Sequence, residues 1–356
     1  MNPAFWQGKR VFVTGHTGFK GSWLSLILER LGARVHGYAR PPHTNPSLFT
    51  KAGVEAGIDS RVGEITDLPN VIAAFEAAEP DVVFHLAAQA IVRDSYADPT
   101  STFATNVMGT ANLLEAVRRH PSARAVVVVT SDKCYENREW WWSYREKSAL
   151  GGRDPYSASK ACAELVTSAY RRSYFSELRG ADHVSLASVR AGNVIGGGDW
   201  SHDRLVPDTI NALIEGRPVE LRYPNAIRPW QHVLEPLSGY ILLAEKLFEA
   251  DNHFAEGWNF APPEEDAKPV GWLVEQMQRA WGVEPQWQPQ GGPKPHEHIY
   301  LKLDSSKARA KLGWTPRLRI EQTVSWVVDW YRAVHEGADA RTLCLESIER
   351  YRSLAG

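Results

Sequence analysis

Apolar and polar positions alternate along the first 190 residues with two different periods. Short runs rich in β-branched residues predict strands, and longer stretches with helical spacing predict helices. Residues 125–129 are apolar throughout, which is typical of a strand buried on both faces. Strands are also predicted at 11–13, 34–39, 62–65, 81–86 and 183–189, and helices from Trp23 to Leu31 and at 71–78, 102–119 and 156–170.

The turn between the first strand and the first helix has a glycine at every third position, Gly15, Gly18 and Gly21. We expect Gly15 to allow a tight turn, Gly18 to let the backbone approach a pyrophosphate, and Gly21 to let the helix pack close to the strand. Phosphate would then lie at the positive end of the helix. The motif predicts a dinucleotide site, and the alternative is a glycine-rich turn without a ligand.

Strands and helices alternating at this spacing predict an α/β fold, a doubly wound parallel (Rossmann) sheet with a smaller C-terminal substrate-binding lobe. After Gly192 the alternation breaks, and a helix predicted at 235–248 returns to the first domain. We therefore assign residues 1–190 with 233–256 to a dinucleotide-binding Rossmann domain. We assign residues 191–232 with 257–356 to the substrate-binding lobe.

Composition excludes several classes of function. The formal net charge of −2 gives no basic bias toward nucleic acid or an anionic membrane. The three cysteines lack C-x-x-C spacing, so neither a disulfide framework nor a metal site is expected. No signal peptide and no apolar run of about 20 residues is seen, and we expect a cytoplasmic protein.

Tyr156 and Lys160 stand four residues apart, which places a phenol and an ammonium on one helix face. A nearby ammonium favours phenolate, so we expect the pKa of Tyr156 to fall toward neutrality and the side chain to accept a proton from a sugar hydroxyl. The pair follows a glycine turn and a buried strand that ends in Thr130 and Ser131. The alternative is a solvated helix face.

Together these residues resemble the extended short-chain dehydrogenase/reductase family over nearly the whole chain. His85-Leu-Ala-Ala-Gln89 and the Asn106 segment match that family as well, although Asn106 could equally be a core-facing polar residue. The resemblance implies NAD as the coenzyme. The residues that would bind it are Gly15, Thr17, Gly18, Phe19, Gly21, Arg40, Glu64, Ile65, Leu86, Ala87, Ala88, Gln89, Asn106, Thr130, Tyr156 and Lys160.

The segment Thr130-Ser-Asp-Lys-Cys-Tyr135 resembles the nucleotide-sugar 4,6-dehydratases of that family. By this resemblance Ser131 would hydrogen-bond the sugar 4-oxygen, Asp132 would be the acid at the 6-hydroxyl and Lys133 the base at C5. The Asp-Lys form implies CDP-glucose as the substrate. A lysine base must be neutral and an acid must hold a proton, and these two demands are mutually consistent. The alternative for Asp132 and Lys133 is a surface ion pair.

The planar guanidinium group of arginine can donate two hydrogen bonds to phosphate oxygens, so several residues are candidates to bind the substrate diphosphate. The substrate-binding candidates are Gln89, Arg190, Asn193, Arg204 and Arg228. Each arginine could equally be structural. The run Trp140-Trp-Trp142 has two interpretations. It could form an apolar flap that excludes water or stacks on a nucleotide base. Alternatively, it is a packed loop or an oligomer contact. Relatives of this kind are commonly homo-oligomers, dimers or tetramers.

The combined prediction is an NAD-dependent lyase that converts CDP-glucose to CDP-4-keto-6-deoxy-D-glucose and water. In the family this step opens routes to the deoxyhexoses of bacterial surface polysaccharide such as O-antigen. Another 4,6-dehydratase, a 4-epimerase and a catalytically silent coenzyme-binding protein are the alternatives. One signal conflicts with NAD: the second strand ends at Arg40, and an arginine there would suit the 2′-phosphate of NADP.

Overall fold

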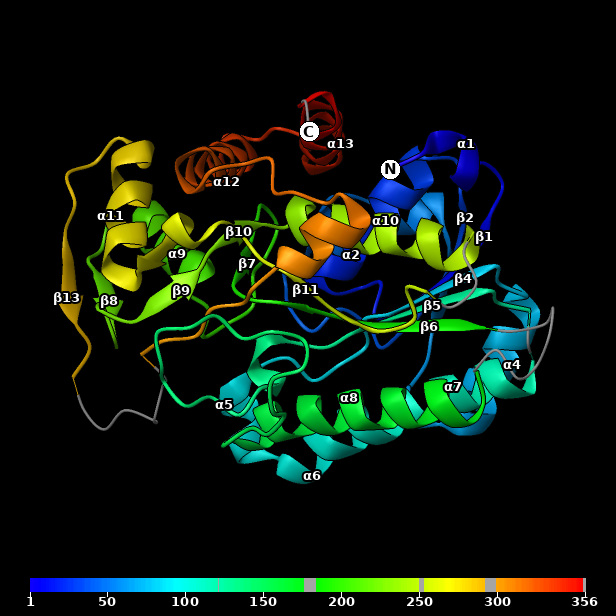
Figure 1. Cartoon of the computed structure of the whole chain (residues 1–356). Helices are drawn as coiled ribbons and strands as arrows, with labels where there is room; N and C mark the ends of the chain where they lie inside the picture. Colours follow the sequence, from blue (N-terminus) through cyan, green and yellow to red (C-terminus); the bar gives the residue numbers. More distant parts are fainter. Residues whose placement is uncertain (121, 176–183, 250–252, 292–298, 355–356) are drawn as a thin grey trace.

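The computed structural model describes the chain except residues 121, 176–183, 250–252, 292–298 and 355–356. In this described part, a seven-stranded parallel sheet forms the centre, with the strand order β11-β6-β5-β4-β1-β2-β3 (Figure 1). The strands are β1 (Arg10–Thr14), β2 (Arg34–Ala39), β3 (Asp59–Val62), β4 (Val82–His85), β5 (Ala125–Val129), β6 (Ser185–Ala191) and β11 (Gly257–Phe260). The predicted doubly wound fold is confirmed.

The valines of β5 show why this sheet forms. Val127 packs into the core on one face of the sheet, and Val126 and Val128 pack into the core on the other. Successive side chains of a strand point to opposite faces, so a strand with apolar residues at every position is stable only between two layers of helices.

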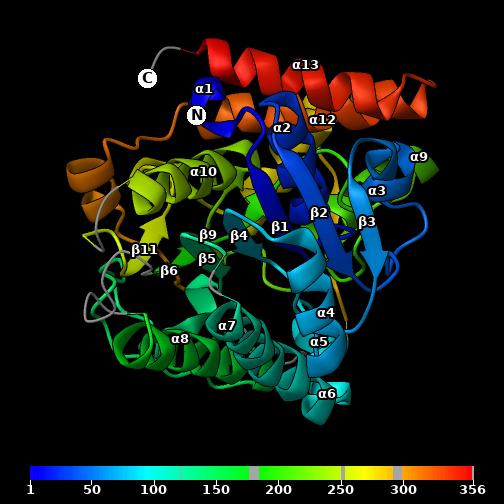
Figure 2. The same cartoon turned by 90° about the vertical axis from the view of Figure 1, so that its right-hand side faces the viewer.

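Helices cover both faces of the sheet (Figures 1 and 2). One layer contains α4 (Leu68–Ala78), α5 (Val92–Ala97), α6 (Pro99–Phe103), α7 (Gly109–Arg119) and α8 (Pro155–Ser173). The other contains α1 (Pro3–Trp6), α2 (Phe19–Arg30), α3 (Leu48–Lys51), α10 (Leu234–Glu249), α12 (Ile320–His335) and α13 (Ala340–Ser353). None of the helices in the described ranges is long and apolar enough to span a membrane.

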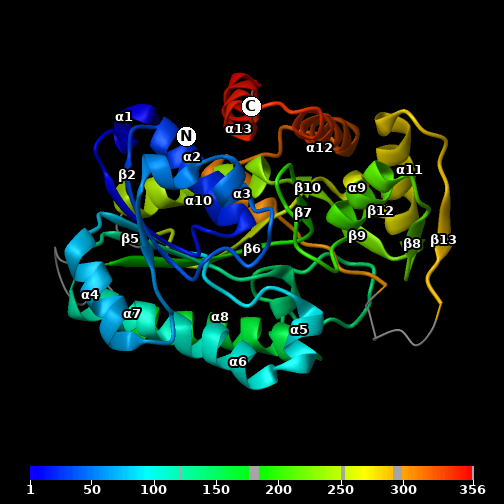
Figure 3. The ribbon, with the colours of Figure 1, turned by 180° about the vertical axis from the view of Figure 1, so that it is seen from behind.

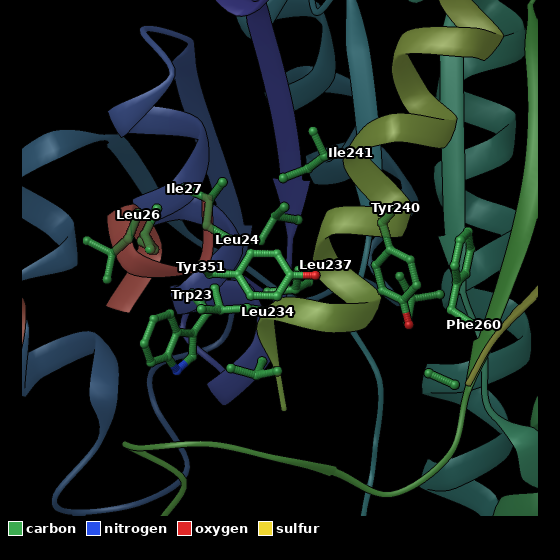
Figure 4. Close-up of a cluster of buried hydrophobic side chains, with 14 of the residues drawn as sticks. Trp23, Leu24, Leu26, Ile27, Leu234, Leu237, Tyr240, Ile241, Phe260 and Tyr351 are labelled. Carbon is green, nitrogen blue, oxygen red and sulfur yellow. The ribbon is translucent and has the colours of Figure 1, made fainter. Parts of the chain in front are cut away.

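The C-terminal helix α13 is fastened to α10. Figure 4 shows Tyr351 of α13 among apolar side chains of α2 and α10. The Tyr351 hydroxyl donates to the Glu235 carboxylate over 2.7 Å, and this carboxylate also accepts from the backbone of Arg317 and Leu318. Burial raises the pKa of Glu235 to about 7.

Short elements gather at one end of the molecule (Figure 3). They are α9 (Leu205–Glu215), α11 (Val270–Trp281), β8 (Val219–Leu221), β9 (Ile227–Pro229), β12 (Ala267–Pro269) and β13 (Trp287–Pro289). Strand β8 pairs with β13 and β9 with β12, and β7 (Val194–Ile195) pairs with β10 (Gln231–His232) nearer the sheet. Short helices lie at Val54–Gly57, Asp132–Cys134, Glu264–Asp266 and Ala308–Leu312.

Some predicted boundaries need correction. The third strand is Asp59–Val62 rather than 62–65, because an edge strand with mostly exposed side chains lacks the apolar pattern used to find it. Strand β11 lies inside the segment 257–356 assigned to the lobe, yet it pairs with β6 in the central sheet. The predicted strand 183–189 is seen from Ser185 to Ala191, and His183 lies outside the described residues.

The predicted long helix 102–119 is not one regular α-helix. Helix α6 passes through a π-helical turn, Ala104–Met108, into α7. Asn106 lies in this turn. π-Turns inside helices are frequent at functional sites, because the extra residue changes the direction in which a side chain points.

Candidate active site

A cavity of about 980 Å³ lies along the carboxyl ends of the central strands. It is lined by the turns after β1, β4, β5 and β6 and by residues of the lobe. Ligands bind at this edge in open α/β sheets, where strand order reverses between β1 and β4. Most predicted site residues line it: Gly15, Thr17, Gly18, Phe19, Gly21, Arg40, Glu64, Ile65, Leu86, Ala87, Ala88, Gln89, Thr130, Ser131, Asp132, Lys133, Tyr156, Lys160, Asn193, Arg204 and Arg228.

The glycine turn has the geometry that the motif predicts at two of its positions. Gly15 has a φ of 76°, and a Cβ there would lie 2.6 Å from the backbone nitrogen of Ala87. A Cβ at Gly21 would overlap the carbonyl oxygen of Gly15. Gly18 precedes α2 and provides no side-chain cap, which leaves the first N–H groups of the helix available to an anion at the cavity.

The adenosine end of a dinucleotide would meet Arg40 and Glu64, which follow β2 and β3. The Arg40 guanidinium lies 3.8 Å from the Glu64 carboxylate, and both side chains are substantially exposed. Thr17 donates to the backbone carbonyl of Arg40 over 2.9 Å, which connects the glycine turn to the end of β2. A carboxylate therefore stands at this end of the cavity, and it comes from the loop after β3.

The end of β5 presents three polar side chains to the cavity. Ser131 caps the short helix that begins at Asp132 by accepting from the backbone N–H of Lys133, and it donates to Asp132 Oδ1 over 3.0 Å. Asp132 Oδ2 is buried and has no hydrogen-bond partner among the described residues. Burial raises the pKa of Asp132, although Lys133, Ser131 and Arg228 oppose the rise. This direction agrees with the prediction that Asp132 holds a proton.

Tyr156 and Lys160 lie on the cavity side of α8 and are both buried. The predicted fall of the Tyr156 pKa is wrong for this structure: burial raises it to about 12, the hydrogen bond with Ser131 lowers it and the charge of Asp132 raises it. Burial also lowers the pKa of Lys160 to about 8, while Glu164 opposes that change. The Lys160 ammonium donates to the Val129 carbonyl over 3.3 Å, which holds it at the end of β5.

Asn106 does not line the cavity, so the structural alternative given for it holds. Its side chain accepts from the backbone N–H of Gln89 over 2.8 Å and donates to the Gln89 carbonyl and to Ser159. Ser159 in turn donates to the Tyr156 carbonyl. Asn106 therefore joins the loop after β4 to the first turn of α8. It positions Tyr156 and Gln89, and the buried Oε1 of Gln89 has no partner in the part of the chain that the structure describes.

Arg190 is also displaced from its predicted role in binding the diphosphate. Its guanidinium makes two hydrogen bonds to the Glu164 carboxylate, over 2.8 and 2.6 Å, and donates to the Tyr135 hydroxyl. Thr130 and Ser188 donate to the same carboxylate. Burial alone would raise the pKa of Glu164, but Arg190 and these donors keep it below its usual value. Arg190 is thus the buried counter-ion of Glu164.

We expect Arg190→Met to lower the free energy of unfolding by about 3–5 kcal/mol, because it leaves the Glu164 charge buried and unpaired. Urea unfolding measures this change. The matched control is Arg145→Met, which removes an exposed partner of Asp304 and should cost less than about 1 kcal/mol. A variant as stable as the wild type that loses affinity for nucleotide-sugar would restore the predicted role of Arg190.

The other predicted substrate ligands do line the cavity. Arg228 is buried and donates to the backbone carbonyl groups of Ile227 and Ile299. Arg204 pairs with Asp199 over 3.1 Å. Asn193 stands at the end of β6, where its carbonyl accepts from the backbone of Gln231.

Lys20 and Asp199 are two of several charged residues that line the cavity and that no motif had predicted. Lys20 lies inside the glycine motif, where only the glycines carried an argument, and Asp199 follows Gly198 in a glycine-rich loop. Lys20 could have been noticed, because a lysine at this position faces the ligand end of the helix. Asp199 gave no comparable signal.

The tryptophan run does not close the cavity. None of Trp140, Trp141 and Trp142 lines it, and the last two are 73% and 69% exposed. Trp140 packs against Tyr144, with ring centroids 5.6 Å apart. The flap interpretation therefore does not hold in this structure.

Comparison with known proteins gives the family. The family model described as GDP-mannose 4,6 dehydratase matches residues 12–327. The chain belongs to this family. It is 52% identical to the CDP-glucose 4,6-dehydratase of Salmonella typhimurium, over 99% of both chains. The resemblance to the nucleotide-sugar dehydratases and epimerases is thereby confirmed.

Solved structures show the same fold. The dTDP-glucose 4,6-dehydratase of Bacillus anthracis in complex with NAD has a TM-score of 0.77 at 22% identity, covering 92% of this chain and 97% of that one. The UDP-glucose 4-epimerase of Thermus thermophilus in complex with NAD has a TM-score of 0.76 at 26% identity, covering 91% and 99%. Members of this dehydratase family and 4-epimerases therefore share one scaffold.

Proposed function

We propose that the protein is an NAD-dependent lyase that dehydrates CDP-glucose to CDP-4-keto-6-deoxy-D-glucose. The observation that carries the proposal is the arrangement of Ser131, Asp132 and Lys133 at the cavity, directly after the strand whose end Lys160 contacts. CDP as the nucleotide is supported by the 52% identity to the Salmonella enzyme over the full length.

The residues present fit a dinucleotide coenzyme. The space above Gly15 and Gly21 is too small for any side chain, and α2 begins at the cavity with uncapped N–H groups. These features would hold the pyrophosphate, with Arg40 and Glu64 at the adenosine end and Tyr156 and Lys160 at the nicotinamide end. When bound, NAD supplies a hydride acceptor for C4 of the sugar and returns the hydride to C6.

Tyr156 takes the proton of the sugar 4-hydroxyl in the first step. Only the phenolate of Tyr156 can accept this proton, and burial favours the neutral phenol, so the hydrogen bond with Ser131, which lowers the pKa of Tyr156, favours the reactive form. Ser131 lines the cavity and would turn its hydroxyl from Asp132 to the sugar 4-oxygen when substrate binds. Lys160 serves the same step by carrying a positive charge beside the reacting groups.

Lys133 and Asp132 serve the second step, once C4 is a ketone and the C5 hydrogen is acidic. Lys133 removes the C5 proton, and Asp132 gives its proton to the 6-hydroxyl, which leaves as water. The unpartnered Oδ2 of Asp132 and its raised pKa suit a carboxylic acid that donates. A 4-epimerase needs Tyr156 and Lys160 but no acid and base at these two positions.

The experiment that tests this proposal is incubation with CDP-, dTDP-, GDP- and UDP-glucose, followed by mass spectrometry of the products. We expect CDP-glucose alone to lose one water efficiently. Loss of water from another nucleotide-sugar would mean that the nucleotide is not CDP. Conversion without a change in mass would indicate an epimerase. The cytoplasmic location and a dimer or tetramer stay predictions from the sequence.

NAD is expected to bind at least about tenfold more tightly than NADP. The Glu64 carboxylate partly neutralises Arg40 and would repel a 2′-phosphate. Titration of both coenzymes by calorimetry measures the difference. In Glu64→Gln the preference for NAD should shrink, whereas tighter binding of NADP by the wild-type protein would overturn the choice of coenzyme.

A further inference from the structure

Lys20 is a cationic side chain in the cavity with no assigned role. It is the second residue of α2, between Gly18 and Gly21, and it lines the cavity. Within the described ranges its ammonium makes no hydrogen bond and no ion pair. The glycines around it explain the turn, but nothing in the turn requires a lysine.

Four charged groups face Lys20, and neither acid among them is free to serve as its counter-ion. Asp199 already pairs with Arg204 over 3.1 Å and accepts from the backbone of Ser201. Asp132 acts on Lys20 through its charge but makes no hydrogen bond or ion pair with it in the described ranges, and burial raises the pKa of Asp132. The remaining two groups, Arg204 and Lys160, are cations.

The balance of these groups lowers the pKa of Lys20 to about 8. Burial is the largest cause, Arg204 and Lys160 add to it, and Asp132 and Asp199 oppose it. Lys20 is only partly exposed, and a partly desolvated cation without a partner in the described ranges favours a ligand that brings negative charge to it.

We propose that Lys20 binds a phosphate oxygen of a diphosphate group in the cavity. Two features of this position favour a phosphate. The Lys20 ammonium and the free N–H groups at the start of α2 both attract an anion. Two diphosphates enter the cavity under the proposed function, those of the dinucleotide and of the nucleotide-sugar, and this inference rests on that function for their identity.

The proposal predicts how binding depends on pH. A bound phosphate raises the pKa of Lys20, so the ligand binds the protonated form. Affinity is therefore greatest below about pH 8 and falls as the pH rises above it, and binding at about pH 8 takes up to about half a proton from solution through Lys20. Lys160 titrates in the same range, so only the difference between variants isolates Lys20.

The test is isothermal titration calorimetry on Lys20→Gln and Lys20→Arg. One arm titrates NAD alone, and the other titrates CDP-glucose in the presence of NADH, which allows binding without oxidation of the sugar. Each arm is run in two buffers with different ionisation enthalpies, so that proton uptake is measured together with affinity. Lys51→Gln, which removes an exposed lysine at the end of α3, is the matched control.

Lys20→Gln should weaken one of the two ligands by about tenfold to a hundredfold and lose the proton uptake assigned to Lys20. The titration in which the affinity falls identifies the diphosphate that Lys20 binds. Lys20→Arg should keep the affinity near pH 7 but lose the fall at higher pH, and Lys51→Gln should match the wild type. The melting temperature of Lys20→Gln should not decrease, because the substitution removes a desolvated charge.

Equal affinities and equal proton uptake in the wild type and Lys20→Gln, in both arms, would overturn the proposal. That result is distinct from a failure of the proposed function. If the wild-type protein binds NAD but not CDP-glucose, the substrate is wrong, and the NAD arm still decides the role of Lys20.

Discussion

Lys133→Met is expected to oxidise C4 of the sugar and then stop. Methionine keeps the approximate length of the side chain but removes any base, so the C5 proton stays in place and water is not expelled. Loss of a positioned general base typically costs about 10²–10⁴ in rate, and we expect elimination to slow by at least about a hundredfold. Tyr156 and Lys160 are untouched, so the first hydride transfer should continue.

Stopped-flow absorbance of the reduced nicotinamide measures this arrest directly. On mixing with CDP-glucose, Lys133→Met should accumulate reduced coenzyme on the enzyme, while the wild type shows only a small steady-state level. The control is Lys147→Met, which changes an exposed lysine in the connection between β5 and α8. Dehydration by Lys133→Met at nearly the wild-type rate would mean that Lys133 is not the base at C5.

Tyr156→Phe should block the reaction one step earlier. Phenylalanine cannot accept the proton of the 4-hydroxyl, so C4 is not oxidised and no reduced coenzyme appears after mixing. The Tyr156 hydroxyl meets Ser131, and the removal of one hydroxyl from a buried ring changes packing very little. We expect hydride transfer to fall by about 10²–10⁴ while CDP-glucose still binds.

Tyr170→Phe on the same helix is the matched control, because Tyr170 does not line the cavity. It should behave as the wild type. The appearance of reduced coenzyme at the wild-type rate in Tyr156→Phe would assign proton removal to another group. Tyr156→Phe and Lys133→Met together separate oxidation from elimination. Tyr156→Phe should show no absorbance of reduced coenzyme, whereas Lys133→Met should accumulate it.

The sequence predicts this fold well where local pattern and burial agree. The valines of 125–129 need apolar surroundings on both faces, and only a central parallel strand provides them. Prediction fails where tertiary pairing decides the structure. Strand β3 is mostly exposed and is ordered by pairing with β2, and β11 completes the sheet from a segment far along the chain. No local pattern reveals such partners.

The candidate site divides in a similar way. Positions fixed by backbone geometry, such as Gly15 and Gly21, follow from the motif, because their steric demands are local. The roles of the arginines do not follow from the motif, because each role depends on which carboxylate lies near the guanidinium group. Arg190 meets the buried Glu164, whereas Arg204 meets Asp199 inside the cavity.

Titration behaviour also depends on burial that spacing does not reveal. Four residues of separation on a helix correctly place Tyr156 and Lys160 on one face of α8. Desolvation raises the pKa of Tyr156 to about 12 and lowers that of Lys160 to about 8. The hydrogen bond with Ser131 opposes the rise for Tyr156.

The central claim is that one hydride leaves C4 and returns to C6 of the same sugar while water is lost. CDP-glucose labelled with deuterium at C4 tests it most directly, with the product analysed by NMR and mass spectrometry. We expect a 4-keto-6-deoxy product that carries the deuterium at C6, with no net reduced coenzyme during steady turnover. Two results would contradict it. One is reduced coenzyme that carries the deuterium and accumulates in proportion to product. The other is a sugar whose mass is unchanged and that keeps the deuterium at C4.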